Sequence, residues 1–531
     1  MLPHEKLADA LKVLKAAQDK GQRVIRSAQL PRLTRERLVR AGHLRLIVKG
    51  WYMPARPEDA PGDSTAWFAS MRDFIRGYCD ARFGPDWYAS PELSVQLHAG
   101  DTALPKQVVI HAKNGDNNPV ALPEGTSLFA YAAKDFAPPA SIVERGGVRV
   151  LGLPWALAGV SAAFFRARPR DAHIALAQLG SASELLSVLL EGGQSVVAGR
   201  LAGALRAIRR PELADEVRET MRSAGYTVSE SNPFELPPAG ITLHKEESPH
   251  AARMRLLWHE MREDVIAAFG KEPGLPPDPA TYLAQVKERY ATDAYHSLSI
   301  EGYRVSEHLI ERVRTGEWNP DAVKADADAR NAMAARGYWQ AHNAVKETIK
   351  AILAGKNAGG AAREDHGAWY RELFGPSVTA GIVKAADLAG YRNGQVTIRN
   401  SMHVPPPKEA VRDCMPVLFE LLAQESSAAV RAALGHFAFV FIHPYMDGNG
   451  RIGRFLMNAM LASGGYPWTI VRVERRAEYM AALEEASVNG NVKPFAALLA
   501  GMVAEQMAEK PGRVSRRRAR KAAHSDRRGR R

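Results

Sequence analysis

Apolar residues recur at helical spacing through most of the second half of the chain. The pattern predicts helices over Ala252–Phe269, onward to Tyr295 after a pause at Gly274–Pro279, and over Ala432–Ile442 and Ile452–Leu461. The last two runs are separated by a His-Pro step and a polar loop with several glycines. Proline disfavours helical geometry in the residue before it, so the pattern predicts a helix, a loop and a second helix in a mainly helical region.

The first 56 residues show short alternating elements. We expect a helix over residues 4–19, a short segment Ser27–Leu30, and a helix Arg35–Ala41 capped by Thr34. Alternation over Leu44–Met53 around Lys49-Gly50 predicts two paired strands. This order is typical of a winged helix-turn-helix, whose candidate DNA contacts would be Arg35, Arg37, Arg40, Arg45 and Lys49. Small winged helices also serve as protein-interaction modules, so both interpretations stay open.

The region 57–230 predicts a mixed α+β domain. A helical run, Ala66–Arg82, precedes strand-like Gln107–His111, Leu128–Tyr131 and Val148–Leu151, and helices follow from about Ser181 to Ala224. No nucleophile, metal cluster or phosphate loop stands out, which favours a structural or partner-binding scaffold. Several prolines between residues 231 and 249 predict a linker, which leaves 250–507 as a separate domain.

Length and composition favour a soluble, multi-domain cytoplasmic protein. A chain of 531 residues exceeds what one core usually holds. Its two cysteines, Cys79 and Cys414, give neither a disulfide framework nor metal-ligand spacing, which fits a reducing compartment. The N-terminus lacks an apolar signal sequence, and the apolar stretch Leu151–Phe165 is too short to span a bilayer.

The positive charge is concentrated at the C-terminal end. Residues 508–531 form the tail, and within it Lys510–Arg531 hold eleven basic residues and one acid, and so most of the net charge of +13. Such a run cannot build a core and predicts a disordered tail that binds polyanions or only improves solubility.

The loop between the last two helical runs carries the chemistry of a phosphate site. Glycines 448 and 450 allow close backbone approach, and the N–H groups that open the next helix form an anion site. His443 titrates near neutrality and suits a general base, while Asp447 is a hard oxygen ligand for Mg²⁺. Arg451 and Arg454 lie three apart on one helix, where their guanidinium groups would grip phosphates.

The stretch from His443 to Arg454 resembles the signature of the Fic family, His-Pro-Phe-x-(Asp/Glu)-Gly-Asn-Gly-Arg-x-x-Arg, with Tyr445 in place of Phe. Most members transfer AMP from ATP to a Ser, Thr or Tyr hydroxyl of a protein. The resemblance implies that His443 is the base and Asp447 the Mg²⁺ ligand. It assigns the anion hole and phosphate contacts to Gly448, Asn449, Gly450, Arg451 and Arg454. The Doc-like branch, which phosphorylates, has Lys at the position of Gly450.

A second segment resembles the inhibitory helix of the same family, (Ser/Thr)-x-x-x-Glu-(Gly/Asn). Here it reads Ser297 to Gly302, with Gly302 placed to end a helix. The resemblance implies that Glu301 pairs with Arg454 and blocks the seating of the ATP γ-phosphate. It also implies that Val396–Ile398 is one arm of a β-hairpin flap that holds the target in extended form.

The first 230 residues resemble AbiEi-type antitoxins, including the Gly-Trp-Tyr-Met-Pro end of the hairpin and the Tyr-Ala-Ser-Pro-x-Leu-Ser piece from Tyr88. The combined prediction is an autoinhibited protein adenylyltransferase that uses ATP and Mg²⁺ and has an N-terminal DNA-binding domain. Its target is a protein, with this chain itself as one candidate. Two alternatives stay open: removal of AMP by the same site, with Glu301 orienting water, and a DNA-binding antitoxin or regulator whose Fic domain senses nucleotide. The target, the base preference, the operator and the oligomeric state stay open as well.

Overall fold

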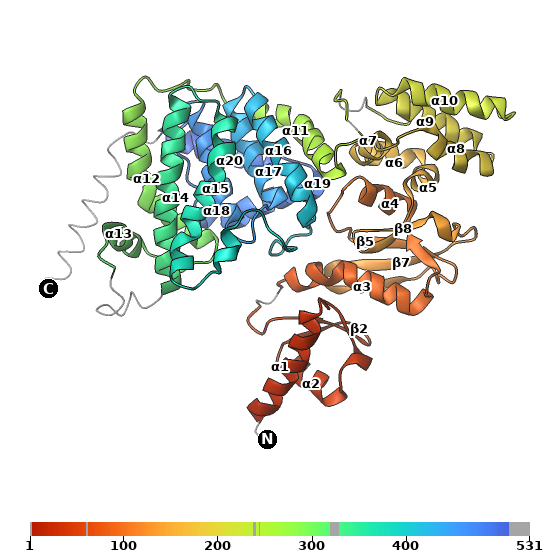
Figure 1. Cartoon of the computed structure of the whole chain (residues 1–531), viewed down its shortest axis with the longest axis horizontal. Helices are drawn as coiled ribbons and strands as arrows, with labels where there is room; N and C mark the ends of the chain where they lie inside the picture. The colour runs from red at the N-terminus through yellow and green to blue at the C-terminus, as the bar shows by residue number, and fades with distance from the viewer. Residues whose placement is uncertain (1–2, 60–61, 237–239, 244, 319–328, 509–531) are drawn as a thin grey trace. The chain divides into compact units, whose positions relative to one another are not determined.

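The computed structural model describes residues 3–59, 62–236, 240–243, 245–318 and 329–508, in two compact units (Figure 1). The first unit is Met1–Leu256 together with Gln395–Asp413, and the second is Leu257–Gly394 with Cys414–Arg531. The chain therefore leaves the second unit at residue 395 and returns to it at residue 414. The predicted tail, 508–531, lies outside the described residues except for its first position.

The N-terminal part of the first unit has the predicted order of helix, short helix, helix and strand pair. Its strands form a three-stranded antiparallel sheet in the order β1-β3-β2. Its elements are α1 (Pro3–Asp19), β1 (Ile25–Arg26), η1 (Ser27–Gln29), α2 (Arg32–Arg40), β2 (Leu44–Val48) and β3 (Trp51–Pro54). A small core containing Leu14, Ile25, Leu38 and Leu44 holds them together.

Helix α2 begins earlier than predicted. Pro31 occupies the N-cap position with extended backbone (φ −54°, ψ 141°), which suits the residue before a helix, and Arg32 is the first helical residue. Thr34 therefore lies inside the helix, so its predicted capping role is wrong.

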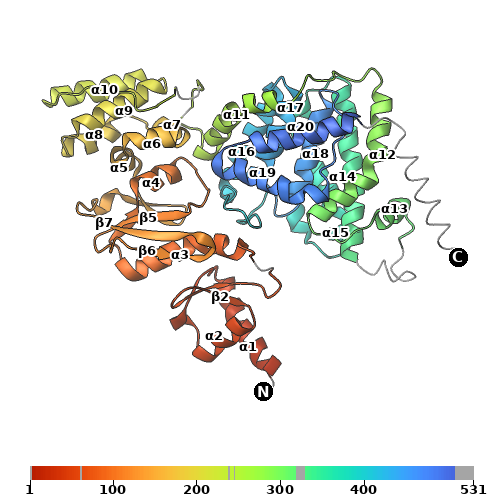
Figure 2. The ribbon, with the colours of Figure 1, turned by 180° about the vertical axis from the view of Figure 1, so that it is seen from behind.

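A four-stranded sheet forms the middle of the first unit, in the order β4-β5-β7-β6 with β5 and β7 parallel. Helix α3 packs on it, and Trp67, Phe74, Ile110 and Leu128 are fully or almost fully buried between them (Figure 2). A separate hairpin, β8–β9, follows. The bounds are α3 (Thr65–Phe83), β4 (Trp87–Ala89), α4 (Pro91–His98), β5 (Gln107–Ala112), β6 (Pro119–Ala121), η2 (Pro123–Gly125), β7 (Ser127–Ala132), η3 (Pro139–Ser141), β8 (Ile142–Arg145) and β9 (Val148–Leu151).

Six short helices complete the first unit around a second apolar core, in which Phe165, Leu185, Leu201 and Val217 are buried. These helices are α5 (Leu153–Gly159), α6 (Ala162–Ala167), α7 (Pro169–Ala177), α8 (Ala182–Glu191), α9 (Ser195–Ala207) and α10 (Pro211–Ser223).

All the described regular elements of the second unit are helices, and the first residues of one of them, α16, belong to the first unit. Helices α14 and α15 run side by side, and α17 packs along α18 (Figures 1 and 2). The unit boundaries fall within α11 and within α16. The bounds are α11 (Pro249–Ala268), α12 (Pro279–Ile300), α13 (Glu307–Thr315), α14 (Ala329–Leu353), α15 (Ala358–Thr379), η5 (Ala385–Leu388), α16 (Lys408–Gln424), α17 (Ala428–Ile442), α18 (Asn449–Ala462), η6 (Val473–Arg475), α19 (Arg476–Asn489) and α20 (Lys493–Ala508).

The predicted β-hairpin flap is wrong in its secondary structure. Residues 395–407 contain no strand, and the one β-bridge in this segment joins His403 to Ala103. Asn400 has left-handed backbone (φ 57°), which is not compatible with a continuing strand. Pro405, Pro406 and Pro407 lack the N–H groups that a returning strand would need.

Cys79 and Cys414 are buried free thiols, as the lack of a disulfide pattern predicted. In the described ranges no single helix is long and apolar enough to cross a membrane, although the bent pair α7 and α8 together reach that length and composition.

Candidate active site

His443 lies at the C-terminal end of α17. It caps the helix with left-handed backbone (φ 53°, ψ 59°), a rare conformation for a residue with a side chain, so the turn into Pro444 fixes its position. The Nδ1 atom lies 3.1 Å from the carbonyl oxygen of Val440. If Nδ1 carries the hydrogen and donates it there, Nε2 is the free acceptor.

Burial lowers the pKa of His443 to about 4, despite opposing contributions that include its contact with Val440. The imidazole is therefore neutral at neutral pH, and its pKa lies below the near-neutral value that the residue type alone predicted. A neutral imidazole with a free Nε2 can accept a proton from a hydroxyl group.

Gly448 and Gly450, near the end of the turn after His443, lie where a side chain would not fit, for different reasons. Gly448 has φ +80°, and a Cβ there would lie 2.6 Å from Cε2 of Phe374. At Gly450 a Cβ would lie 2.3 Å from Oε1 of Glu301. The first turn of α18 starts at Asn449, and its leading N–H groups have no partners within the helix, so this end favours an anion.

The side chain of Asn449 holds the turn together. Its Oδ1 accepts from the N–H of Tyr445 at 2.9 Å, and its Nδ2 donates to the carbonyl of Tyr445 at 2.8 Å. The side chain predicted as part of the anion hole is therefore occupied inside the protein. Only its backbone N–H, at the start of α18, is placed to meet a phosphate.

Arg451 is buried between two aromatic rings. Its guanidinium carbon lies 4.9 Å from the ring centre of Phe374 and 5.1 Å from that of Tyr303, and Nη2 lies 3.4 Å from Oδ2 of Asp447. Its buried Nε has no hydrogen-bond partner in the described structure. A buried guanidinium with an unused donor is a favourable partner for a phosphate oxygen.

Arg454 is held by the end of helix α12. Its Nε donates to Oγ of Ser297 at 2.9 Å, and Nη2 donates to the Ser297 carbonyl at 3.0 Å and to Oε1 of Glu301 at 2.7 Å. Burial acts to raise the pKa of Glu301, but the charges of Arg454 and Arg451 outweigh it and leave the pKa below its usual value. The structure therefore brings Ser297, Glu301 and Arg454 together as the inhibitory-helix resemblance implied.

Gly302 ends α12 as predicted, with φ +85° directly after the C-cap residue Glu301. The carboxylate lies at the negative end of the helix dipole, where it is disfavoured, and the ion pair with Arg454 offsets that cost.

Asp447 lies on the exposed side of the turn, with 66% of its side chain accessible. Its Oδ1 accepts from the N–H of Gly448 at 2.6 Å. The described residues contain no cluster of three or more His, Cys, Asp or Glu suited to a metal ion. One accessible carboxylate beside a phosphate site still fits Mg²⁺, which takes most of its ligands from water and phosphate.

Three residues that sequence reasoning did not assign support this site. Arg392 donates to the carbonyls of Pro444, through its backbone N–H at 2.8 Å, and of His443, through Nε at 2.8 Å. Tyr303 and Phe374 flank Arg451. The sequence gives no local signal for the contacts of the two aromatic residues with Arg451, because they lie 148 and 77 positions before it.

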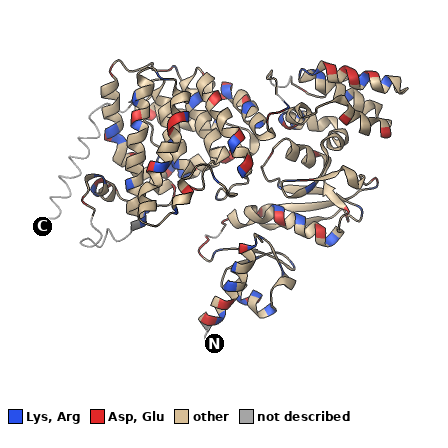
Figure 3. Cartoon of the chain, viewed as in Figure 1, with Lys and Arg blue, Asp and Glu red and all other residues tan. Residues whose placement is uncertain are grey.

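The candidate DNA contacts of the N-terminal part differ in how free their side chains are. Arg35 donates to the Ser27 carbonyl and Arg37 to the Lys6 carbonyl. Arg45 donates to the Asp63 carbonyl and pairs with Glu124, which gives it a structural role. Arg40 and Lys49 are exposed. Charges of both signs lie on α1 and α2 (Figure 3), so this part of the chain does not present a uniformly basic surface.

Residues 363–461 match the Fic/DOC family, and this stretch contains the whole turn from His443 to Arg454. The C-terminal region of the chain thus contains a Fic domain. A protein adenylyltransferase Fic of Nematostella vectensis is 26% identical over 252 residues, which cover 46% of this chain and 54% of the relative. A protein adenylyltransferase of Caenorhabditis briggsae is 38% identical over 108 residues, or 20% of this chain and 21% of the relative. The chain thus spans about half the length of the first relative and a fifth of the second.

Two solved structures are also similar. A Fic-1 fragment from C. elegans is 20% identical with a TM-score of 0.36, covering 63% of this chain and 86% of that one. A Fic domain containing signaling protein from Bacteroides thetaiotaomicron is 18% identical with a TM-score of 0.32, covering 46% of this chain and 92% of that one.

Proposed function

We propose that this protein is an autoinhibited adenylyltransferase that transfers AMP from ATP to a Ser, Thr or Tyr hydroxyl of a protein. The observation that carries the proposal is the meeting of three kinds of group on one turn. A neutral imidazole lies at the end of α17, an anion-binding helix N-terminus opens α18, and Arg451 and Arg454 lie on the first two turns of that helix. The names of the relatives support AMP as the transferred group.

In the proposed step the target hydroxyl oxygen bonds to the α-phosphorus of ATP while Nε2 of His443 takes the hydroxyl proton. The bond between the α-phosphorus and the bridging oxygen breaks, and pyrophosphate leaves with that electron pair. The N–H groups of the first turn of α18 and the guanidinium of Arg451 neutralise the phosphate charge, which is the main catalytic need in such transfers.

Asp447 would hold Mg²⁺ through its accessible carboxylate, and the cation would add positive charge beside the leaving pyrophosphate. The turn keeps that carboxylate in place through its hydrogen bond with the N–H of Gly448.

Glu301 restrains this activity in the proposed resting state. Its carboxylate occupies one side of the Arg454 guanidinium. It also lies so close to Gly450 that a methyl group added at that residue would collide with it. A γ-phosphate would compete for the same guanidinium. Replacing Glu301 with glycine frees Arg454 and should increase transfer.

The test uses the full-length chain with Mg²⁺, α-labelled ATP and cell lysate as the acceptor pool. The three proteins are wild type, Glu301→Gly, and Glu301→Gly combined with His443→Ala. We expect protein labelling in Glu301→Gly, with about 10²- to 10⁴-fold less in the double variant, the usual contribution of a general base. No labelling by any variant would overturn the proposal.

Glu301 is ionised at neutral pH, so it also suits the second role of orienting a water molecule for removal of AMP. Labelled protein from the first experiment serves as the substrate for this alternative. Release of AMP by wild type that is lost in Glu301→Gly would assign removal, rather than addition, as the main reaction.

DNA binding by residues 1–56 remains a separate prediction. Arg40 and Lys49 have exposed side chains, so Arg40→Ala with Lys49→Ala should weaken binding of a duplex and reduce its salt dependence. Arg45→Ala acts as a structural comparison because its side chain is engaged with Asp63 and Glu124. Equal affinity of the double variant and wild type would contradict the prediction.

A further inference from the structure

The C-terminal end of helix α12 fixes the backbone of Tyr303 as well as that of Glu301. Glu301 is the C-cap residue, and Gly302 after it has left-handed backbone (φ +85°). The N–H of Gly302 donates to the Ser299 carbonyl at 3.0 Å, and the N–H of Tyr303 donates to the Leu298 carbonyl at 3.1 Å. These two bonds form a Schellman motif. One helix end therefore places a carboxylate and, two residues later, an aromatic ring.

The backbone after Tyr303 is fixed too. The N–H of Arg304 donates to Oδ1 of Asn331, a buried residue of α14, at 3.1 Å. Tyr303 is thus tied to α12 through its own N–H and to α14 through the next residue. The position of the ring is set by two helices of the second unit, and not by the side chains that it touches.

The ring of Tyr303 lies against the guanidinium of Arg451. Cζ of Arg451 is 5.1 Å from the centre of this ring and 4.9 Å from the centre of the Phe374 ring. Arg330 of α14 lies over the Tyr303 ring as well, at 5.7 Å. All four residues belong to the second unit. Aromatic faces attract cations, so the two rings hold the charged end of Arg451 from different elements of one unit.

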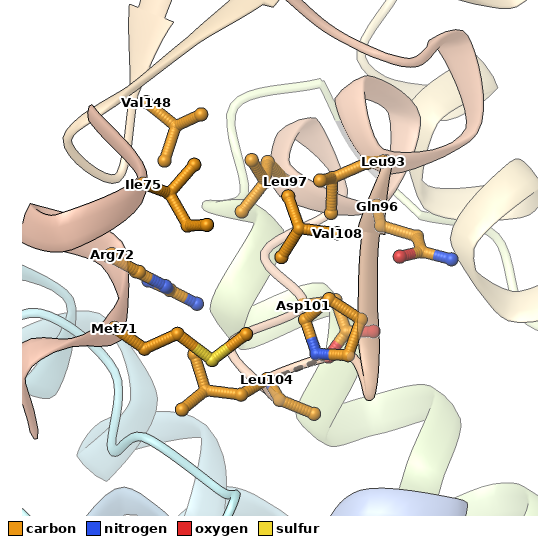
Figure 4. A pocket seen from close by; sticks show the side chains of 12 residues that line it. Met71, Arg72, Ile75, Leu93, Gln96, Leu97, Asp101, Leu104, Val108 and Val148 are labelled. Atoms are coloured by element: carbon orange, nitrogen blue, oxygen red, sulfur yellow. Dashed lines mark hydrogen bonds between the residues drawn. The ribbon is translucent and has the colours of Figure 1, made fainter. Parts of the chain in front are cut away.

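Two other arginines of the chain are held through their N–H donors instead. Arg72 lies beside a narrow, mainly apolar cavity of about 30 Å³ (Figure 4), and its Nη2 donates to the Thr102 carbonyl at 2.9 Å. The buried Arg253 donates to the Ala99 carbonyl through Nε at 3.3 Å and Nη2 at 3.2 Å. A guanidinium that is held in this way has fewer donors left for a ligand.

Arg451 keeps donors available because rings hold it. It is 1% exposed, and its buried Nε has no hydrogen-bond partner in the described structure. Its contact with Asp447 is long, 3.4 Å from Nη2 to Oδ2. A ring attracts the charge of a guanidinium without using a particular N–H group, so the donors stay free to meet phosphate oxygens.

We propose that Tyr303 is a positioning residue for Arg451, whose guanidinium it holds ready for the phosphates of ATP. This inference rests on the proposed function, because that function assigns Arg451 to those phosphates. The end of α12 then acts on the two phosphate arginines in opposite directions. Glu301 occupies Arg454 and lowers activity. Tyr303 keeps Arg451 oriented and raises the affinity for phosphate.

Positioning of this kind affects binding more than chemistry. Without the Tyr303 ring, the guanidinium of Arg451 loses its orientational freedom only when a phosphate binds, and that loss weakens binding. Once ATP is bound, the phosphate itself holds the guanidinium. Replacement of the ring should therefore raise KM for ATP and leave kcat for transfer close to its original value.

The test uses the full-length chain with Glu301→Ala as the parent. Alanine removes the carboxylate and suits the φ of −83° at the C-cap. Tyr303→Leu keeps an apolar side chain without the aromatic face, whereas Tyr303→Phe loses only the hydroxyl. Tyr295→Leu is the matched control. Tyr295 is a half-buried residue of α12 whose ring lies against His296, and among the described residues no arginine or lysine lies over it.

Initial rates of labelling at a fixed amount of lysate give apparent kcat and KM for ATP, and calorimetry with Mg²⁺ and inorganic pyrophosphate gives the affinity for phosphate alone. We expect Tyr303→Leu to raise KM and to weaken pyrophosphate binding, each about five- to tenfold, through loss of one desolvated cation–π contact. Its kcat should stay within about twofold of the parent value. Tyr303→Phe and Tyr295→Leu should match the parent. An unchanged KM in Tyr303→Leu, or equal losses in Tyr303→Leu and Tyr303→Phe, would overturn the inference.

Thermal unfolding of each variant shows whether the fold is intact. If Tyr303→Leu does not fold, Tyr303→Met takes its place, because methionine is apolar and adapts to irregular gaps. A fall in kcat with KM unchanged would also contradict the positioning role, since a general loosening of the domain acts in that way.

Pyrophosphate binding separates this inference from the proposed function. If the parent binds pyrophosphate but labels no protein, the transferase proposal fails, and the ratio of affinities between Tyr303→Leu and Tyr303→Phe alone decides the positioning role. If the parent does not bind pyrophosphate, the positioning role is wrong as well, because Arg451 then has no phosphate to meet.

Discussion

The turn 442–454 of the candidate active site and the loop 395–407 are two segments that are fixed in opposite ways. The turn is held largely by its own residues: the side chain of Asn449 is hydrogen-bonded to the backbone of Tyr445, and Gly448 and His443 adopt left-handed backbone. The loop is held at its tip by residues more than 330 positions away in sequence. The geometry of a locally fixed segment depends on its own sequence, whereas the geometry of a remotely fixed one depends on residues far away in the chain.

The strongest way to disturb the locally fixed segment is Gly448→Ala. The new Cβ would be strained by the positive φ and would collide with Phe374, whose ring packs on Arg451. We expect a loss of about 2–4 kcal/mol in the free energy of unfolding, from backbone strain and overpacking together. Thermal or urea unfolding of the full chain measures it.

Gly316→Ala is the matched control for that loss. Gly316 has φ +81°, almost the same as Gly448, but no atom lies within 4 Å of the added Cβ. It should lose only the strain part, about 1–2 kcal/mol. Equal losses at the two positions would mean that the contact with Phe374 adds nothing to the rigidity of the turn.

The pH dependence of transfer tests whether burial sets the chemistry of the turn. With a pKa of about 4, His443 stays neutral from pH 8 down to pH 5. An unperturbed histidine with a pKa of about 6.5 would lose roughly thirtyfold of its neutral form at pH 5. We expect the transfer rate of Glu301→Gly to be nearly constant between pH 5 and 8. Initial rates of protein labelling at each pH measure it.

Intrinsic fluorescence over the same pH range shows whether the protein stays folded. The lowered pKa means that the folded state binds this proton less tightly than the unfolded chain does. The shift therefore costs stability as the pH falls below about 6.5. A midpoint of the rate near pH 6.5, with the fold intact, would show that the imidazole is well solvated.

Glu301→Gln separates the charge of the inhibitory side chain from its shape. Glutamine can still accept from Arg454, but the charge-assisted part of that bond is lost, which is worth about 1 kcal/mol. Transfer should rise fivefold to tenfold over wild type and stay below Glu301→Gly. Glu364→Gln, which breaks an exposed ion pair with Lys356 in the same unit, should leave transfer unchanged.

The sequence was most informative where the chemistry is local. His443, Gly448, Gly450, Arg451 and Arg454 fall within one run of twelve residues, and Glu301 followed by Gly302 carries its own helix-end signal. The structure brings the predicted Ser297, Glu301 and Arg454 into contact. The hydrogen bonds of the Asn449 side chain with Tyr445 could not be predicted from the sequence, since a motif position does not show whether a side chain faces inward.

Long-range contacts explain the predictions that were wrong. Alternation around Val396 predicted a strand, but this segment has no strand partner in the described structure, and His403 pairs with Ala103 instead. Arg45 stays a predicted contact of the DNA-binding wing, but its side chain donates to the Asp63 carbonyl, a partner that basic residues alone do not reveal. Burial also moved the pKa of His443 away from the value that residue type suggests.

The smallest expected effect is on the free energy of unfolding, when either residue of the Arg399–Asp63 ion pair is replaced. Arg399 is 62% exposed, so its bond with Asp63 is worth less than about 1 kcal/mol and should weaken with salt. Asp63→Ala also removes the acceptor for the N–H of Thr65 at the start of α3, and should cost about 1–2 kcal/mol. Urea unfolding of Arg399→Ala and Asp63→Ala at low and high salt measures both. If the two variants lose the same stability and salt removes the whole difference from wild type, Asp63 serves only the ion pair. A larger, salt-independent loss in Asp63→Ala would show that Asp63 stabilises the start of α3 through Thr65 whether or not Arg399 is present.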